Sequence, residues 1–283
     1  MGGLGNQMFQ YAFGKNFAHK TKNELKFDLS EFENAENTAV PRKYDLDIFN
    51  VKAEFATADE AFRLSKRTNN HFIDRILNRA IGFKKSFILE PHFHFSETVF
   101  DHPDNIYLHG YWQSEKYFAE IEPQIRQDFT FREEMTDKAK EMLEKINNAN
   151  SVCVNVRRGD FVTNDFHGSM GTEYYQKAEA VIKAKTNGET YFVFSDDVEW
   201  CEANLKFDAP TVFVSHDYAG KKFQDYLRLM AACKNFIIPN SSFAWWAVWF
   251  NNNQERIVIA PKKWFGDPNF DTKDLIPPDW IRV

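Results

Sequence analysis

The sequence is poor in cysteine: three residues among 283, and Cys153, Cys201 and Cys233 show neither paired nor CxxC spacing. This scarcity argues against a disulfide framework and against a zinc knuckle. No uninterrupted apolar run approaches the ~20 residues that a membrane-spanning helix needs, and no signal peptide is evident. We therefore expect a protein of the reducing cytoplasm.

The signatures of several common enzyme classes are also missing. The opening "GGLGNQ" lacks GxGxxG spacing and a P-loop lysine, so it indicates neither a dinucleotide fold nor a Walker ATPase. No GxSxG elbow is present and no cysteine is paired with an obvious base, which disfavours a covalent hydrolase. The histidines at 92, 94, 102 and 109 have no carboxylate or cysteine at zinc-site spacing. We expect them to be ordinary surface or core histidines.

The charge balance is acidic, with 35 basic and 41 acidic residues and a net charge of −6. A broadly basic surface for nucleic acid is therefore not expected. Against this background Arg157 and Arg158 follow directly on the run "SVCVNV", which ends at Val156. Two adjacent guanidinium groups at the mouth of a buried strand are costly to desolvate and need an anion to offset that cost. The pair predicts a small anionic ligand.

The second half of the chain alternates between short apolar runs and helix-like segments. This alternation predicts an α/β fold with a doubly wound parallel sheet, because near-continuous apolar runs are typical of strands covered on both faces. The predicted strands are 151–156, 190–195, 211–215, 235–240 and 256–261. The predicted helices between them are 172–185, 198–205, 222–233 and 244–250.

The first half is less regular. A helix is expected over 8–20 and a strand in "ELKFDLSEF". The segment 133–150 resembles a helix that ends in a polar linker, so we place the domain boundary near 148. This gives an N-terminal domain over 1–148 and a C-terminal domain over 149–283.

Polar clusters follow three of the predicted strands: "NVRRGD" from Asn155, "SDD" at 195–197 and "NSSF" at 240–243. In a parallel sheet the ligand crevice lies beyond the carboxyl ends of the strands. We therefore expect the three clusters to converge on one edge of the sheet.

Each cluster has more than one interpretation. The forked donors of an arginine match two phosphate oxygens, yet an ion pair with Asp160 explains one arginine equally well. "SDD" can hold a metal-bound nucleotide diphosphate, accept hydrogen bonds from N1 and N2 of guanine, or cap the helix that follows. "NSSF" can bind an anion at a helix N-terminus or act as a plain N-cap. In "GGLGNQ" the glycines allow close backbone approach, and Asn6 and Gln7 offer uncharged hydrogen-bonding groups.

Over nearly its whole length the chain resembles the bacterial alpha-1,2-fucosyltransferases. The motifs that carry the resemblance stand in the family's order: "GGLGNQMFQYAFGK", "RKYDLDIFNV", "GYWQSEKYF", "FSDDVEW", "LMAACKNFIIPNSSFAWWAVWF" and "PKKWF". The resemblance implies a GT-B-like architecture, with two Rossmann-like doubly wound domains facing across a cleft. The acceptor would lie against the N-terminal domain, and GDP-fucose would bind the C-terminal domain.

The resemblance also implies roles for individual residues. The family motif HxRRxD gives Arg157 the donor diphosphate and gives Arg158 and Asp160 a supporting role. Asp196 is assigned to guanine. The remaining donor contacts implied are Gly5, Asn6, Asn155, Ser241, Ser242 and the backbone of Phe243. Asn155 stands where the family has histidine, so any role that needs protonation near neutral pH is lost at this position.

The implied reaction is the inverting transfer of L-fucose from GDP-beta-L-fucose to the 2-hydroxyl of a terminal galactoside. Arg157 and Asn6 are the catalytic residues implied, and Asp160 is a candidate base if no arginine occupies its carboxylate. We expect no cofactor and no metal, because a guanidinium group can replace a divalent ion at the diphosphate. The expected acceptor is a galactose-terminated glycan or a lipid-linked oligosaccharide of O-antigen or capsule, which implies work at the inner face of the cytoplasmic membrane.

Two alternatives stay open: a transferase for another GDP-sugar or acceptor position, and a non-catalytic nucleotide-sugar binder. Family members also carry an apolar strand before the opening glycines, whereas only Met1 precedes them here. We therefore expect the first strand of the N-terminal domain to be missing from this chain.

Overall fold

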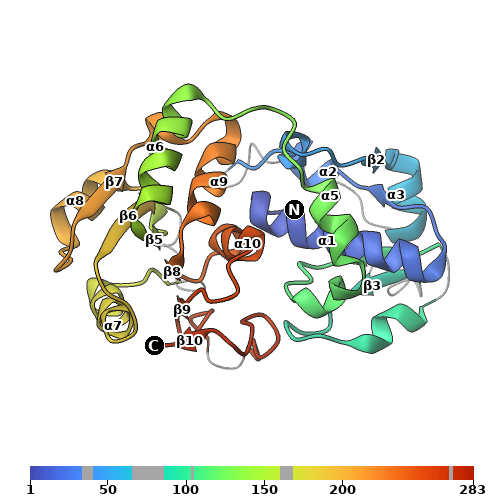
Figure 1. Ribbon diagram of the computed structural model, residues 1–283. Coiled ribbons are helices and arrows are strands. Elements are labelled where there is room, and N and C mark those ends of the chain that lie inside the picture. The colour runs from blue at the N-terminus through green and yellow to red at the C-terminus, as the bar shows by residue number, and fades with distance from the viewer. Residues whose placement is uncertain (34–40, 66–85, 103–104, 160–167, 268–269) are drawn as a thin grey trace. The chain divides into compact units, whose positions relative to one another are not determined.

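The computed structural model describes residues 1–33, 41–65, 86–102, 105–159, 168–267 and 270–283. The chain forms two compact units, and each is described by itself. Unit 1 comprises Met1–Thr130 together with Asp271–Leu275. Unit 2 comprises Phe131–Phe270 together with Ile276–Val283 (Figure 1).

Unit 2 contains a six-stranded sheet in which all neighbouring strands are parallel. Its spatial order is β10-β9-β8-β5-β6-β7. The strands are β5 (Asn150–Val156), β6 (Glu189–Ser195), β7 (Thr211–Val214), β8 (Asn235–Ile237), β9 (Val258–Ala260) and β10 (Ile281–Arg282). The five strands predicted from apolar runs are thus confirmed, and β10 is added.

The strand order creates a switch point in the middle of the sheet. The chain starts at β5, adds β6 and β7 on one side, and then returns to place β8 on the other side of β5. In open α/β sheets, ligands bind outside the carboxyl ends of the strands where the order reverses in this way. The fold therefore singles out the carboxyl ends of β5 and β8.

Helices cover both faces of this sheet (Figure 1). Val152, Val154 and Val156 of β5 share one buried cluster with Tyr175 and Ala178. That cluster lies beneath α7 (Thr172–Lys183) and α8 (Val198–Asn204). The other face lies beneath α6 (Asp137–Asn148), α9 (Gln224–Ala232) and α10 (Ser242–Phe250). Burial on both sides explains why the strands are apolar without alternation.

The three tryptophans of α10 belong to the core. Trp245, Trp246 and Trp249 are at most 5% exposed, and Trp246 meets both neighbours edge to face. The three rings therefore fill the core and offer no exposed face to a ligand.

Helix α6 belongs to unit 2, whereas the domain boundary predicted from the sequence lies after it. Ala139, Met142 and Ile146 form the buried face of α6. They pack toward β5 and α9, elements of the same unit. Since that apolar stripe is satisfied within unit 2, the chain divides at residue 130 and not near 148.

Unit 1 is built around α1 (Leu4–Thr21), which is buried along most of its length. Phe13 of α1 stacks on Trp112, with ring centroids 4.3 Å apart, and Phe17 stacks on Phe100. Trp112 is 2% exposed and is therefore a core residue. The other helices among the described residues of unit 1 are α2 (Ser30–Glu33), α3 (Ala58–Ser65) and α5 (Glu122–Asp128), and short 3-10 turns lie between them.

The described strands of unit 1 form two short parallel pairs. β1 (Lys26–Phe27) pairs with β2 (Glu54–Phe55), and β3 (Phe87–Leu89) pairs with β4 (Tyr107–His109). The strand predicted in "ELKFDLSEF" is confirmed only for Lys26–Phe27. It ends early because Asp28 accepts the backbone N–H of Ser30 at 2.9 Å and starts α2.

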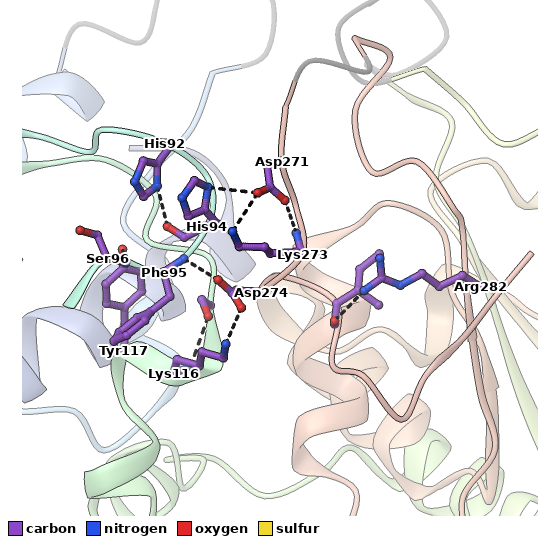
Figure 2. Close-up of polar contacts among 12 residues, drawn as sticks. His92, His94, Phe95, Ser96, Lys116, Tyr117, Asp271, Lys273, Asp274 and Arg282 are labelled. Carbon is purple, nitrogen blue, oxygen red and sulfur yellow. Dashed lines mark hydrogen bonds and ion pairs between the residues drawn. The ribbon is translucent and has the colours of Figure 1, made fainter.

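The late segment Asp271–Leu275 packs within unit 1 (Figure 2). Asp274 accepts the backbone N–H of Phe95 at 3.0 Å and forms an ion pair with Lys116. Asp271 lies 3.5 Å from His94, whose ring stacks on His92. The two histidines thus stack on each other at the site where this segment is anchored.

Candidate active site

The three polar clusters lie at the carboxyl ends of three adjacent strands. Val156, the last residue of β5, stands opposite Ser195, the last residue of β6. Val154 of β5 stands opposite Ile237, the last residue of β8. Arg157, Asp196 and Asn240 therefore follow neighbouring strand ends at the switch point. The predicted convergence on one edge of the sheet is confirmed.

Arg157 and Asp196 form the central contact of this edge. Arg157 Nη1 lies 2.9 Å from Asp196 Oδ2, and the backbone N–H of Arg158 donates to Asp196 Oδ1 at 2.9 Å. The side chains of Arg157 and Asp196 are 27% and 22% exposed. Both groups are thus held in place while part of each remains open to solvent, as a binding site for a charged ligand requires.

Gly159 lets the Asp196 carboxylate approach the loop that follows β5. A Cβ at this position would lie 2.6 Å from Asp196 Oδ2, which is closer than any normal contact. A side chain here would displace the carboxylate. The glycine of "RRGD" is therefore explained by the position of Asp196.

Arg158 has different partners from its neighbour. Its Nε lies 3.3 Å from Asp197 Oδ2, and its guanidinium carbon lies 3.7 Å from the ring centre of Trp200. Asp197 also caps α8 by accepting the N–H of Trp200 at 3.1 Å. Within "SDD" the capping role thus belongs to Asp197, and Asp196 is left for the site. Asp160, the expected partner of Arg158, lies outside the described residues.

Asn155 is committed to the interior. It is 8% exposed, its Nδ2 donates to the Phe194 carbonyl at 3.1 Å, and its own carbonyl accepts the Tyr175 hydroxyl at 3.2 Å. Burial holds the pKa of Tyr175 well above its usual range, so this hydroxyl remains a donor. A role of Asn155 in donor binding stays a prediction.

The N-terminus of α10 completes this edge in unit 2. Ser241 is its N-cap and accepts the N–H of Ala244 at 3.4 Å, and no acidic residue stands in the first turn. Ser242 and Phe243 are partly exposed at the start of the helix. The N–H groups and the helix dipole at such an end favour an anion.

In unit 1, Gly5 and Asn6 lie in the first turn of α1. The N-cap of this helix, Gly3, supplies no side-chain hydrogen bond. Asn6 Oδ1 accepts a hydrogen bond from Gln113 Nε2 at 2.7 Å. Gln7, the other amide of "GGLGNQ", is 3% exposed and bonded to the backbone of Gly2, Lys43 and Asp45. Gln7 therefore holds the chain together, and Asn6 is the amide available to a ligand.

Glu90 and Gln113 are two further polar residues near Asn6 and its neighbouring turn that the sequence did not predict. Glu90 accepts the backbone N–H groups of Tyr111 at 2.7 Å and Trp112 at 2.9 Å. Burial raises the pKa of Glu90 to about 7 in spite of these two donors. Gln113 lies in the motif "GYWQSEKYF", which carries the family resemblance but assigns no roles, and Glu90 lies in none of the motifs quoted above.

Two features are absent from the part of the chain that the structure describes. No group of three or more histidine, cysteine, aspartate or glutamate residues is arranged there to hold a metal ion. None of the helices in the same described ranges combines the length and apolar character needed to cross a membrane. Metal independence stays a prediction.

Known proteins resemble the chain from end to end. A family model described as Glycosyl transferase family 11 matches residues 1–283. An Escherichia coli alpha-1,2-colitosyltransferase is 33% identical over 293 residues, which cover 100% of this chain and 96% of that protein. The O-antigen biosynthesis glycosyltransferase WbnK of Escherichia coli is 30% identical over 299 residues, covering 100% and 98%.

A solved structure of an Arabidopsis thaliana FUT1 mutant in complex with GDP aligns with a TM-score of 0.50 and 11% identity. The alignment covers 93% of this chain and 70% of that chain. At this identity the similarity shows the fold alone. Together with the parallel sheet of unit 2, it confirms the predicted α/β, GT-B-like fold class.

Proposed function

Since the chain belongs to glycosyl transferase family 11, we propose that it moves L-fucose from GDP-beta-L-fucose to the 2-hydroxyl of a terminal galactoside, with inversion. The observation that carries this proposal is the position of Arg157. It stands one residue beyond the central strand at the switch point, held by Asp196 and partly open to solvent. The proposed ligand of Arg157 is the diphosphate of the donor.

Charge explains why an arginine is needed there. As the bond between sugar and phosphate breaks, negative charge grows on the diphosphate that leaves. A fixed guanidinium group and the N-terminus of α10 stabilise that charge without reorganising during the reaction. A guanidinium group carries five N–H donors in a rigid fork, a geometry that suits the oxygens of phosphate as well as those of a carboxylate.

Asp196 retains capacity to bind guanine. An ionised carboxylate offers about four lone-pair sites. Two of them are used, by Arg157 Nη1 and by the backbone N–H of Arg158. The remaining sites are proposed to accept the N1 and N2 donors of guanine, a pattern that adenine does not present.

In the proposed reaction the acceptor hydroxyl attacks from the face opposite the diphosphate and inverts the sugar. The base stays assigned to Asp160 on the motif alone. No divalent ion is proposed, because Arg157 supplies the positive charge. The O-antigen name of one relative supports a lipid-linked repeat unit as the acceptor, met at the inner face of the cytoplasmic membrane.

A second donor is favoured by one comparison. The relative that is 33% identical over the full chain is named for colitose. Colitose is fucose without the 3-hydroxyl group, so both GDP-sugars present the same nucleotide and the same 2-hydroxyl and 4-hydroxyl groups. GDP-colitose is therefore the alternative donor to compare directly with GDP-fucose.

The test is a donor and acceptor screen with the purified chain. GDP-fucose, GDP-colitose and GDP-mannose are each offered with galactose-terminated acceptors, and GDP release and the product linkage are measured. Release of GDP with GDP-fucose and an alpha-1,2 product supports the proposal. Turnover with GDP-colitose alone would select the second donor, and GDP binding without release from any pair would indicate a non-catalytic binder.

A further inference from the structure

The start of α8 in unit 2 holds the side chain of Arg158. The guanidinium carbon lies over the Trp200 ring, 3.7 Å from its centre, and Nε lies 3.3 Å from Asp197 Oδ2. A flat, weakly hydrated guanidinium group is well suited to the face of an indole ring, which attracts cations. The side chain of Arg158 is 18% exposed. It is thus fastened to α8 by one ion pair and one cation–π contact.

Both partners of Arg158 are themselves held. Asp197 donates its backbone N–H to Ser195 Oγ at 2.9 Å, and its Oδ1 accepts the N–H of Trp200 at 3.1 Å. The side chain of Trp200 packs against the buried cluster beneath α7 and α8. The contacts on Arg158 are therefore tied to the end of β6 through Asp197 and to the core through Trp200.

The backbone N–H of Arg158 orients the Asp196 carboxylate. It donates to Asp196 Oδ1 at 2.9 Å, while Arg157 Nη1 lies 2.9 Å from Oδ2 of the same carboxylate. The side chain and the N–H of Arg158 branch from one Cα atom, and the rotamer of a side chain is coupled to its backbone dihedrals. The contact on Trp200 and the orientation of Asp196 are therefore linked through a single residue.

The orientation of this carboxylate matters for recognition of the base. A carboxylate accepts the N1 and N2 donors of guanine together only when both oxygens face the same edge of the base, since bent hydrogen bonds are weak. We propose that Trp200 is a positioning residue for the donor nucleotide: its contact with Arg158 holds the N–H that fixes Asp196 for guanine. This inference rests on the proposed function and adds to it a residue that does not itself touch the donor.

Three substitutions test this role. Trp200→Leu keeps an apolar side chain against the core but removes the aromatic face. Trp200→Phe keeps a smaller aromatic face for the guanidinium group. Arg158→Met keeps an unbranched side chain and removes the charge that pairs with Asp197 and lies over the ring.

The measurement is the ratio of the dissociation constant of IDP to that of GDP, from titration calorimetry at one salt concentration. IDP lacks only the 2-amino group of guanine, so the ratio isolates the contact with N2 from the contacts with ribose and diphosphate. The parent should prefer GDP about 10–100-fold, the value of a hydrogen bond to a charged group. Trp200→Leu and Arg158→Met should each lower this preference about tenfold, and Trp200→Phe should keep it within about threefold of the parent.

Phe207→Leu is the matched control, because it makes the same kind of substitution near the other end of β6. Phe207 is partly buried and packs, like Trp200, against the buried cluster of unit 2. Its ring stacks on Tyr191, with centroids 4.7 Å apart. Loss of packing should lower the melting temperature of both leucine variants, whereas only Trp200→Leu should change the nucleotide ratio.

The double variant Trp200→Leu with Arg158→Met checks that the two residues act through one chain of contacts. Independent effects add, whereas residues that share an interaction lose no more together than one of them loses alone. The ratio for the double variant should therefore match that for Arg158→Met.

Three outcomes would overturn the positioning role and leave the proposed function intact: an unchanged ratio in Trp200→Leu, an equal loss in Trp200→Phe, or additive losses in the double variant. A parent that binds IDP as tightly as GDP would overturn the guanine contact of Asp196 and the positioning role with it. Sugar transfer is tested separately by the donor screen, since the nucleotide ratio requires no turnover.

Discussion

Protonation of Glu90 should make the stability of unit 1 depend on pH near neutrality. Burial raises the pKa of this carboxyl from 4.5 to about 7, and the N–H groups of Tyr111 and Trp112 oppose the shift. Because the pKa is higher in the folded chain than in the unfolded one, the stabilisation is complete below the unfolded pKa. It is lost as pH rises, and the loss is complete once pH exceeds the folded pKa.

The size of the effect follows from the shift. A rise from 4.5 to about 7 corresponds to roughly 3 kcal/mol at ~1.4 kcal/mol per pH unit. This is an upper bound because Glu90 is only partly buried. For a unit of this size, a loss of roughly 3 kcal/mol lowers the melting temperature by about 10 °C.

Glu90→Gln isolates this contribution. Glutamine does not titrate. Its NH2 group would face one of the two backbone N–H donors, and leaving that donor without an acceptor lowers the free energy of unfolding by about 1–3 kcal/mol at acid pH. The parent should therefore melt well above the variant at pH 5, and the gap should shrink or reverse by pH 8. Glu97→Gln, at an exposed position, is the control. Calorimetry that gave the same gap between parent and Glu90→Gln across this pH range would refute the reasoning.

Three further predictions concern the candidate active site. Arg157→Ala should lower turnover by about 10²–10³, as for the loss of a donor to a developing anion, while the melting temperature stays within a few degrees; turnover near that of the parent would contradict the role. Gly159→Ala should weaken GDP binding in a titration, because a Cβ 2.6 Å from Asp196 Oδ2 moves that carboxylate. Gly171→Ala, where a Cβ meets nothing within 4 Å, is its control. Excess chelator should leave transfer unchanged, and complete loss would reveal a metal requirement.

The sheet of unit 2 was largely predictable because its strands are buried on both faces. Such strands appear in the sequence as apolar runs, and the helices between them carry an apolar stripe. β10 was not predicted because it is a strand of two residues, Ile281–Arg282, at the edge of the sheet. One of the two residues is charged, so the strand does not form an apolar run. Helix α6 was predicted from its sequence, but its membership of unit 2 was not. That membership depends on which elements pack against its apolar face, and the periodicity of apolar residues does not identify those elements.

The site was predictable in outline and not in its contacts. Parallel strands bring their carboxyl ends to one edge, so the meeting of Arg157 with Asp196 follows from strand order. The ion pair itself depends on the register that sets Val156 opposite Ser195. The hydrogen bond between Gln113 and Asn6 joins residues 107 positions apart in the sequence. The packing of α1 against residues 110–113 brings the two side chains together.

The most direct test of the central claim is a titration of GDP and guanosine into the parent chain and into Arg157→Ala. If Arg157 binds the diphosphate, the parent should prefer GDP, and the variant should lose about 10–100-fold of GDP affinity, the value of hydrogen bonds to a charged group. Guanosine affinity should not change. A variant that kept the full preference of the parent for GDP over guanosine would contradict the account.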